Sequence, residues 1–151
     1  MTNIAITGAL GRMGTLVIQE MARSPDMRIV AGLDAVGAGR MLSGGIAVRD
    51  ASELKAALQE SRPDVLIDFT IAAAAVENVC TAADMGVNLV VGTTGFSADQ
   101  HAKMRAAIEG RVAAVITPNF SLGVNVFWKL IRDAAAALSD YDIEIIEVHH
   151  N

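Results

Sequence analysis

Three glycines near the start of the chain are spaced so that they could bind a phosphate group. Gly8, Gly11 and Gly14 follow a short apolar run at residues 4–7, and an amphipathic stretch follows at residues 15–23. A strand, a glycine-rich turn and a helix in this order can hold a dinucleotide. Glycine lets the backbone approach the pyrophosphate, and the start of the helix directs N–H groups at it. Ala9 stands where the common fingerprint has its first glycine, so the spacing alone does not separate this site from an ordinary turn.

An acidic residue follows at the distance that a dinucleotide site requires. A second apolar run, residues 27–33, ends in Asp34, twenty residues after Gly14. An acidic side chain at this point binds the hydroxyls of the adenosine ribose in dinucleotide-binding domains. The glycines, the two runs and the acid therefore indicate a dinucleotide site. The competing interpretation is an ordinary turn followed by a surface aspartate, because short motifs also occur by chance.

The glycine turn and Asp34 can meet only if a sheet brings the ends of their strands together. The rest of the chain has the sequence pattern of such a sheet. Apolar runs alternate with segments of helical pattern, which predicts strands at 65–69, 89–91 and 112–117 and helices at 50–59, 72–85 and 98–109. This alternation indicates an α/β fold, a Rossmann-like doubly wound and mostly parallel sheet with helices on both faces. Ligands bind such sheets beyond the carboxyl ends of the strands. There the chain has glycine, hydroxyl and amide residues, at 92–96 and 117–121.

From residue 121 the pattern changes, which predicts the start of a second domain. Apolar residues recur at helical spacing up to Leu138, and Phe127 and Trp128 on this helix are expected in a core. Residues 142–148 alternate between polar and apolar, as in a strand with one exposed face. We therefore expect a dinucleotide-binding domain at residues 1–120, followed at residues 121–151 by the first helix and strand of an incomplete α+β domain.

Composition excludes several classes of protein. Hydrophobic residues make up 52% of the 151 residues, which excludes a disordered chain. With a net charge of −5 and 4% aromatic residues, the chain lacks the basic and stacking surfaces of nucleic-acid binders. No apolar run reaches the ~20 residues of a membrane span, and a strand begins almost at Met1 without a signal sequence, so we expect a cytoplasmic protein. Cys80 is the single cysteine, which excludes an internal disulfide, and we expect no metal site.

Five motifs, in order along the whole chain, resemble those of the 4-hydroxy-tetrahydrodipicolinate reductase (dihydrodipicolinate reductase) family. They are Gly8-Ala-Leu-Gly-Arg-Met-Gly14, Asp68-Phe-Thr70, Val91-Gly-Thr-Thr-Gly-Phe96, Pro118-Asn-Phe-Ser-Leu-Gly-Val-Asn125 and Ile145-Ile-Glu-Val-His-His150. The last three together are highly specific. The resemblance implies an NADPH- or NADH-dependent oxidoreductase. Its substrate would be 4-hydroxy-tetrahydrodipicolinate, an imine-type cyclic dicarboxylate that is reduced to tetrahydrodipicolinate in the diaminopimelate route to lysine.

The resemblance also implies which residues bind the cofactor, NADPH or NADH. The pyrophosphate would lie against Gly8, Ala9, Leu10, Gly11, Arg12 and Met13, and the adenosine ribose against Asp34. Phe69 and Thr70 would lie along the cofactor, and Gly92, Thr93 and Thr94 would contact its nicotinamide half. The nicotinamide carboxamide would be covered by Thr117, Pro118, Asn119 and Phe120.

For the chemical step, the resemblance implies that His149 is the general acid or base and that His150 binds a substrate carboxylate, with Thr94 near the substrate. Histidine suits proton transfer near neutral pH. Adjacent residues of a strand point to opposite faces, so the two histidines would have different roles. Without the motif, we would interpret the pair as a solvated strand end. The family further implies a homotetramer, whose substrate-binding and oligomerisation domain would begin in residues 121–151.

The sequence departs from the family pattern in two ways. It ends at Asn151, before the catalytic lysine and the Asp-Ala-Pro-Ser-Gly-Thr segment of family members. If 151 residues were the whole polypeptide, we would expect a cofactor-binding fragment with little or no turnover. Ala35 stands where many relatives have an arginine for the NADPH 2′-phosphate; Arg12 could supply that charge, and we expect use of both cofactors. The alternatives are another small-metabolite dehydrogenase and a redox-sensing nucleotide-binding module without turnover.

Overall fold

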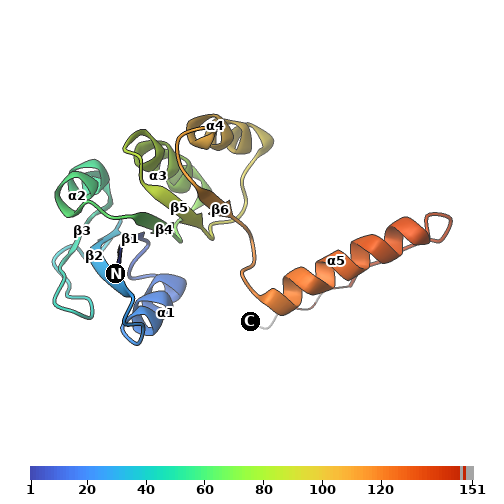
Figure 1. Cartoon of the computed structure of the whole chain (residues 1–151), viewed down its shortest axis with the longest axis horizontal. Helices are drawn as coiled ribbons and strands as arrows, with labels where there is room; N and C mark the ends of the chain where they lie inside the picture. Colours follow the sequence, from blue (N-terminus) through green and yellow to red (C-terminus); the bar gives the residue numbers. More distant parts are fainter. Residues whose placement is uncertain (147, 149–151) are drawn as a thin grey trace. The chain divides into compact units, whose positions relative to one another are not determined.

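The computed structural model describes residues 1–146 and 148 and divides the chain into two compact units. The first comprises Met1–Pro118 and the second Asn119–Asn151. Figure 1 labels the helices and strands of both units. Each unit is described by itself below.

The first unit is built on a six-stranded parallel sheet. Its strands are β1 (Thr2–Thr7), β2 (Met27–Asp34), β3 (Val48–Asp50), β4 (Val65–Asp68), β5 (Asn88–Val91) and β6 (Ala114–Ile116). Their order across the sheet is β3-β2-β1-β4-β5-β6, and every neighbouring pair is parallel. This is the strand order of the doubly wound dinucleotide-binding fold. The predicted α/β fold class is therefore confirmed.

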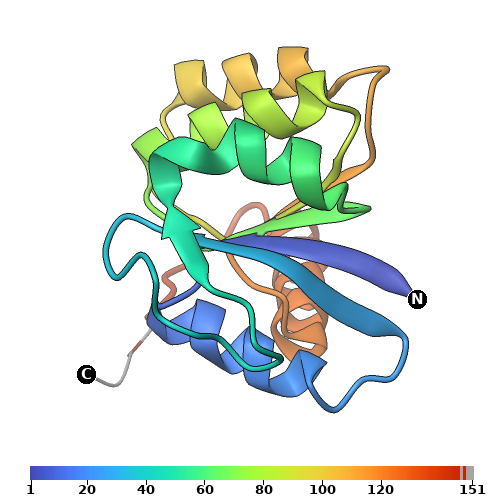
Figure 2. The same cartoon turned by 90° about the vertical axis from the view of Figure 1, so that its left-hand side faces the viewer.

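Helices cover both faces of this sheet. Figure 2 shows α2 (Leu54–Ser61), α3 (Ala72–Asp84) and α4 (Ala98–Ile108) on one face and α1 (Arg12–Met21) on the other. A short 3-10 helix, η1 (Ala51–Glu53), leads from β3 into α2. A parallel sheet carries apolar side chains on both faces, and helices on both faces keep these side chains away from water.

Two clusters of buried side chains join the helices to the sheet. The larger cluster contains Leu66 and Leu89 of the sheet together with Leu58 of α2 and Val79 of α3, each at most 2% exposed. The smaller cluster joins Ile6 of β1 to Ile18 of α1. Burying one such side chain contributes roughly 1.5–3 kcal/mol. These clusters hold the strands in place, so the strand ends can carry polar groups.

Local signals in the sequence correctly mark several helix ends. Ser97 and Gln100 form a capping box at the start of α4, with the Ser97 hydroxyl accepting from the Gln100 N–H and the Gln100 side chain accepting from the Ser97 N–H. Gly86 has φ +72° just after α3, where its N–H bonds the Ala83 carbonyl. A left-handed residue at this point is the usual helix stop, and glycine adopts it without strain.

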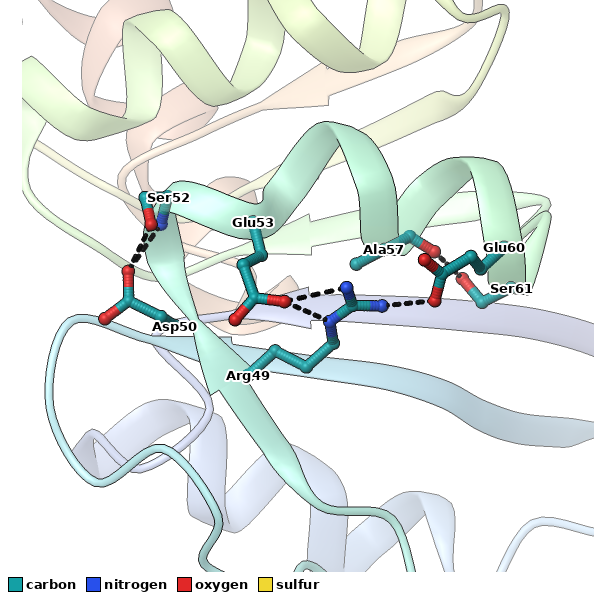
Figure 3. A network of polar contacts seen from close by, with 7 residues as sticks. All are labelled: Arg49, Asp50, Ser52, Glu53, Ala57, Glu60 and Ser61. Carbon is teal, nitrogen blue, oxygen red and sulfur yellow. Dashed lines mark hydrogen bonds and ion pairs between the residues drawn. The ribbon is translucent and has the colours of Figure 1, made fainter.

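A network of polar contacts fixes α2 against the edge strand β3 (Figure 3). The Arg49 guanidinium donates to Glu53 Oε2 from Nε at 3.0 Å and from Nη2 at 2.7 Å, and to Glu60 Oε2 from Nη1 at 2.6 Å. These bonds raise the pKa of Arg49. Asp50 caps η1, and hydrogen bonds from the Ser52 hydroxyl and N–H lower the pKa of Asp50. The Asp50 carboxylate therefore stabilises the fold above its unfolded-state pKa, and this contribution is lost as the pH falls through its lower folded-state pKa.

The second unit contains α5 (Leu122–Ala137), close to the helix predicted there. The Ser121 hydroxyl caps it by accepting the Val124 N–H. The core position expected for Phe127 and Trp128 is wrong for the described residues, because these rings are 60% and 39% exposed. Beyond α5, residues 142–146 and 148 lie outside any strand, which corrects the strand predicted at 142–148. A strand needs backbone partners, and the described residues supply none for this segment. In the described part of the chain, no helix is both long and apolar enough to cross a bilayer.

Candidate functional site

The residues singled out in the first unit meet at one edge of the sheet. In the parallel pairing, Thr7 at the end of β1 lies beside Leu33 of β2 and Asp68 of β4, and Asp68 lies beside Val91 of β5. The glycine turn follows β1, Asp34 is the last residue of β2, and Phe69–Thr70 and residues 92–96 follow β4 and β5. The sheet therefore brings together groups that are as far apart in the sequence as Gly8 and Phe96.

The turn after β1 is packed so tightly that its glycines cannot be replaced without movement. Gly8 has φ +72°, and a Cβ there would lie 2.3 Å from the Phe69 carbonyl oxygen. A Cβ on Gly14 would lie 2.1 Å from the Gly8 carbonyl oxygen. The Ala9 N–H donates to the Leu33 carbonyl at 3.1 Å, which ties the turn to β2. The first glycine is thus needed for conformation and contact, and the third for packing of the helix on the turn.

The start of α1 is suited to an anion. Gly11 is its N-cap and provides no side-chain cap, and its first turn contains no acidic residue. The first N–H groups of a helix have no partner within the helix and carry partial positive charge. A pyrophosphate placed at the turn would accept hydrogen bonds from these groups. The residues present therefore fit the phosphates of a dinucleotide.

A pocket of about 400 Å³ adjoins this turn. Its lining includes Leu10, Asp34, Val36, Thr70 and Ile71. The Asp34 carboxylate accepts the Leu10 N–H at 2.9 Å and the Val36 N–H at 3.3 Å, so its orientation is fixed. Val36 and Ile71 are each 71% exposed and give the pocket apolar walls. A held carboxylate beside apolar walls suits a nucleoside, which has ribose hydroxyls and a flat base.

The segment after β5 lies against the end of β4. A Cβ on Gly92 would lie 2.1 Å from Phe69 Cε1, so a larger residue there would have to displace that ring. The Gly92 N–H donates to the Asp68 carbonyl at 2.9 Å, and the Thr117 N–H donates to the Val91 carbonyl at 3.1 Å. Thr93 is buried, and Thr94 is exposed. The structure thus places Gly92, Thr93, Thr94 and Thr117 at the same sheet edge as the glycine turn.

Four of the predicted residues are not placed at this edge by the structure. Asn119 and Phe120 belong to the second unit, where Asn119 Oδ1 accepts the Ser121 N–H at 2.8 Å. His149 and His150 lie outside the described residues.

Within residues 1–146 and 148, His, Cys, Asp and Glu side chains form no cluster that could hold a metal ion. Burial raises the pKa of the Cys80 thiol, which disfavours the reactive thiolate.

Asp68 begins the Asp68-Phe-Thr70 motif, but its side chain has no role in the site predicted from the sequence. It interrupts an apolar strand, is 0% exposed, and accepts hydrogen bonds from Thr7, Thr70, Asn78 and Thr93. The available signal was a charged residue within the apolar strand predicted at residues 65–69, because a buried carboxylate needs hydrogen-bond donors nearby.

The fold and this edge define a dinucleotide-binding α/β domain of the Rossmann type. Comparison with known proteins identifies its family. The sequence model of the family named dihydrodipicolinate reductase, N-terminus, matches residues 2–120. The model of the family named dihydrodipicolinate reductase, C-terminus, matches residues 123–151. The chain belongs to the dihydrodipicolinate reductase family.

Individual relatives agree with this assignment. A 4-hydroxy-tetrahydrodipicolinate reductase from Methanoculleus marisnigri is 52% identical over 99% of this chain and 58% of its own length. One from Methanosarcina barkeri is 51% identical over 100% of this chain and 60% of its own length. A solved dipicolinate-bound dihydrodipicolinate reductase from Paenisporosarcina sp. TG-14 has a TM-score of 0.76 and 28% identity, over 90% of this chain and 54% of that one. The chain spans somewhat over half the length of the curated relatives that it matches.

The packing of the glycine turn leads to a test on stability. Gly8 and Gly86 share φ +72°, but a Cβ on Gly86 meets no atom within 4 Å. We expect Gly86→Ala to cost about 1–2 kcal/mol of unfolding free energy, from backbone strain. Gly8→Ala should cost about 1–3 kcal/mol more, because the methyl group also collides with Phe69. Urea denaturation measures both, and equal losses would show that the turn can relax around the added group.

Proposed function

We propose that this chain is the dinucleotide-binding part of an NAD(P)H-dependent 4-hydroxy-tetrahydrodipicolinate reductase. The reaction is reduction of 4-hydroxy-tetrahydrodipicolinate to tetrahydrodipicolinate in the synthesis of diaminopimelate and lysine. The observation that carries the proposal is the edge where the uncapped start of α1, the fixed Asp34 carboxylate and the 92–96 segment meet. Family membership supports the choice of reaction, and the dipicolinate bound to the Paenisporosarcina reductase supports a dicarboxylate substrate.

Each part of the cofactor has a proposed partner in the chain. Residues 8–13 bind the pyrophosphate, and Asp34 accepts hydrogen bonds from the adenosine ribose. Phe69 and Thr70 lie along the cofactor between its two halves. Gly92, Thr93 and Thr94 contact the nicotinamide half, and residues 117–120 cover its carboxamide. A cofactor held along this edge would have its reactive ring beside β5 and β6.

The chain's own residues then complete the reduction. The cofactor supplies a hydride when bound, and the protein orients the substrate and supplies a proton. Thr94 is exposed at the proposed nicotinamide end, where its hydroxyl can bind the substrate. His149 serves as the general acid, and His150 binds a substrate carboxylate. Conversion of the 4-hydroxy substrate to tetrahydrodipicolinate takes up one hydride and one proton and releases the 4-hydroxyl group as water, so the step needs an acid beside the substrate.

The two parts of the chain have separate roles in this proposal. Residues 1–120 form the dinucleotide-binding domain, and residues 121–151 begin a substrate-binding and oligomerisation domain. The exposed apolar side chains of α5, among them Phe127 and Leu130, are consistent with a helix that the remainder of such a domain covers. We further propose a cytoplasmic homotetramer.

Loss of the Asp34 charge tests the ribose contact. Asn at this position keeps an oxygen for the Leu10 N–H but loses the charge that strengthens bonds to ribose hydroxyls. Asp34→Asn should therefore raise the Kd for NADH about tenfold or more. Glu109→Gln removes an equal charge from an exposed position after α4 and should leave the Kd unchanged. Calorimetric titration measures both, and equal Kd values for wild type and Asp34→Asn would contradict the assignment.

Substitution of Arg12 tests how the chain binds both NADH and NADPH. It lies in the first turn of α1, and a guanidinium there can pair with the 2′-phosphate that only NADPH carries. Arg12→Ala should raise the Kd for NADPH about tenfold and that for NADH less, because the substitution keeps the backbone N–H of residue 12 that is proposed to face the pyrophosphate. Arg40→Ala removes the same charge from the loop after β2 and serves as the comparison. A loss of NADPH affinity in Arg40→Ala alone would refute the role of Arg12.

His149 tests the reductase chemistry itself, in a polypeptide of the relatives' full length. His149→Gln should lower kcat about 10²–10⁴-fold, because general acid catalysis is lost. The KM for NADH should change little, since this residue does not contact the cofactor in the proposal. Oxidation of NADH with 4-hydroxy-tetrahydrodipicolinate measures both constants. Unchanged kcat would exclude His149 as the acid, and no oxidation by wild type would exclude the reaction.

A further inference from the structure

Asp68 is the most completely buried charged group in the described residues, and the proposed reaction gives it no role. Its side chain is 0% exposed. Oδ2 accepts from the Thr7 hydroxyl and from Asn78 Nδ2, both at 2.7 Å. Oδ1 accepts from the Thr93 hydroxyl at 2.7 Å, the Thr70 hydroxyl at 2.9 Å and the Thr70 N–H at 3.1 Å. The donors come from β1, α3 and the segments that follow β4 and β5.

This carboxylate is held by hydrogen bonds alone. None of the ion pairs among the described residues includes Asp68. Burying a charge costs several kcal/mol unless hydrogen bonds replace the lost water. A neutral side chain could pack in this interior without that cost. We therefore expect the five hydrogen bonds to Asp68 to serve a purpose other than the stability of the fold.

The chemistry of the network fixes the direction of the bonds at Thr93. A carboxylate only accepts, so the single hydroxyl hydrogen of Thr93 points at Asp68 Oδ1. A lone pair of the same hydroxyl oxygen then accepts the Thr70 N–H at 2.9 Å. Thr93 is 6% exposed, and its hydroxyl is used within the protein. Its contribution is thus a link between the segments after β4 and β5.

That link holds a segment with few other polar attachments. Residues 92–96 have neither helix nor strand structure. In this stretch the Gly92 N–H bonds the Asp68 carbonyl, and the Thr93 hydroxyl bonds the Asp68 carboxylate. These two attachments both end on Asp68, and the Thr70 N–H adds a third at the Thr93 hydroxyl oxygen. The next residue, Thr94, is exposed at the edge where the nicotinamide ring is proposed to lie.

We propose that Asp68 is a positioning residue of the dinucleotide site, acting through the Thr93 hydroxyl to hold residues 92–96 in place for the nicotinamide half. The inference rests on the proposed function. The two carboxylate oxygens of Asp68 have different partners. Oδ2 accepts hydrogen bonds from β1 and α3, on the core side of the network, and Oδ1 accepts those from the ligand side. Only the Oδ1 bonds should influence how the nicotinamide half is held.

Two matched variants separate positioning from stability. Thr93→Val and Thr7→Val each replace a buried hydroxyl by a methyl group of the same shape, and each deletes a 2.7 Å bond to the same carboxylate. Thr93→Val also removes the oxygen that accepts the Thr70 N–H at 2.9 Å, whereas the bonds from Thr70 to Oδ1 remain in both variants. The probes are NADH and ADP-ribose, which lacks only the nicotinamide ring. Calorimetric titration of the 151-residue chain gives the ratio of the two Kd values, and thermal unfolding checks that each variant folds.

Thr93→Val should raise the Kd for NADH about fivefold and that for ADP-ribose less than twofold, while Thr7→Val leaves both nearly unchanged. Thr93→Ser, which keeps the hydroxyl, should restore NADH binding. Asp68→Leu removes both acceptor oxygens; it should weaken NADH binding in the wild-type chain and add little in Thr93→Val, because its effect on the nicotinamide half passes through the Thr93 hydroxyl. Equal effects of Thr93→Val and Thr7→Val on the Kd ratio would overturn the inference. So would wild-type NADH binding in Asp68→Leu. Wild-type protein that binds neither probe would instead contradict the proposed function.

Discussion

A single buried carboxylate connects most of the sheet edge on which this account depends. Asp68 receives hydrogen bonds from β1, from α3 and from the segments after β4 and β5. These segments are far apart in sequence and adjacent only because the strands are parallel. The apolar clusters place the strands, but burial of apolar area has no direction and cannot align the polar loops. Directional bonds to a fixed carboxylate supply that alignment.

The same edge shows how stability and ligand binding are divided within the first unit. Below the strand ends, Leu66, Leu89 and Val91 are fully buried between the sheet and its helices. At the strand ends, small residues let backbone and rings approach, as where Gly92 faces the Phe69 ring and Gly8 faces the Phe69 carbonyl. The close approaches leave the start of α1 open toward the pocket beside Asp34. The fold therefore leaves the first N–H groups of α1 and a fixed carboxylate where a charged ligand would lie.

The sequence predicted the elements of the first unit well, because their signals are local. The capping box at Ser97, the glycine stop at Gly86 and the order of strands and helices follow from patterns within a few residues. The network of Asp68 could not be derived this way, since its partners Thr7 and Thr93 become neighbours only when the sheet forms. The strand predicted at residues 142–148 was wrong for the described residues, because alternation gives a strand only if a partner strand is present. The roles of His149 and His150 stay predictions.

The central claim is that the carboxyl edge of the sheet binds a nicotinamide dinucleotide. Its most direct test is an NMR titration of the isotopically labelled 151-residue chain with NADH, following the backbone amide signals. If NADH binds at this edge, the largest chemical-shift changes should fall on the amides of Gly8, Gly11, Asp34, Thr70 and Gly92, which belong to separate segments of the sequence. Shifts confined to the opposite end of the first unit, around Met21 and Met27, or no shifts at saturating NADH, would contradict it.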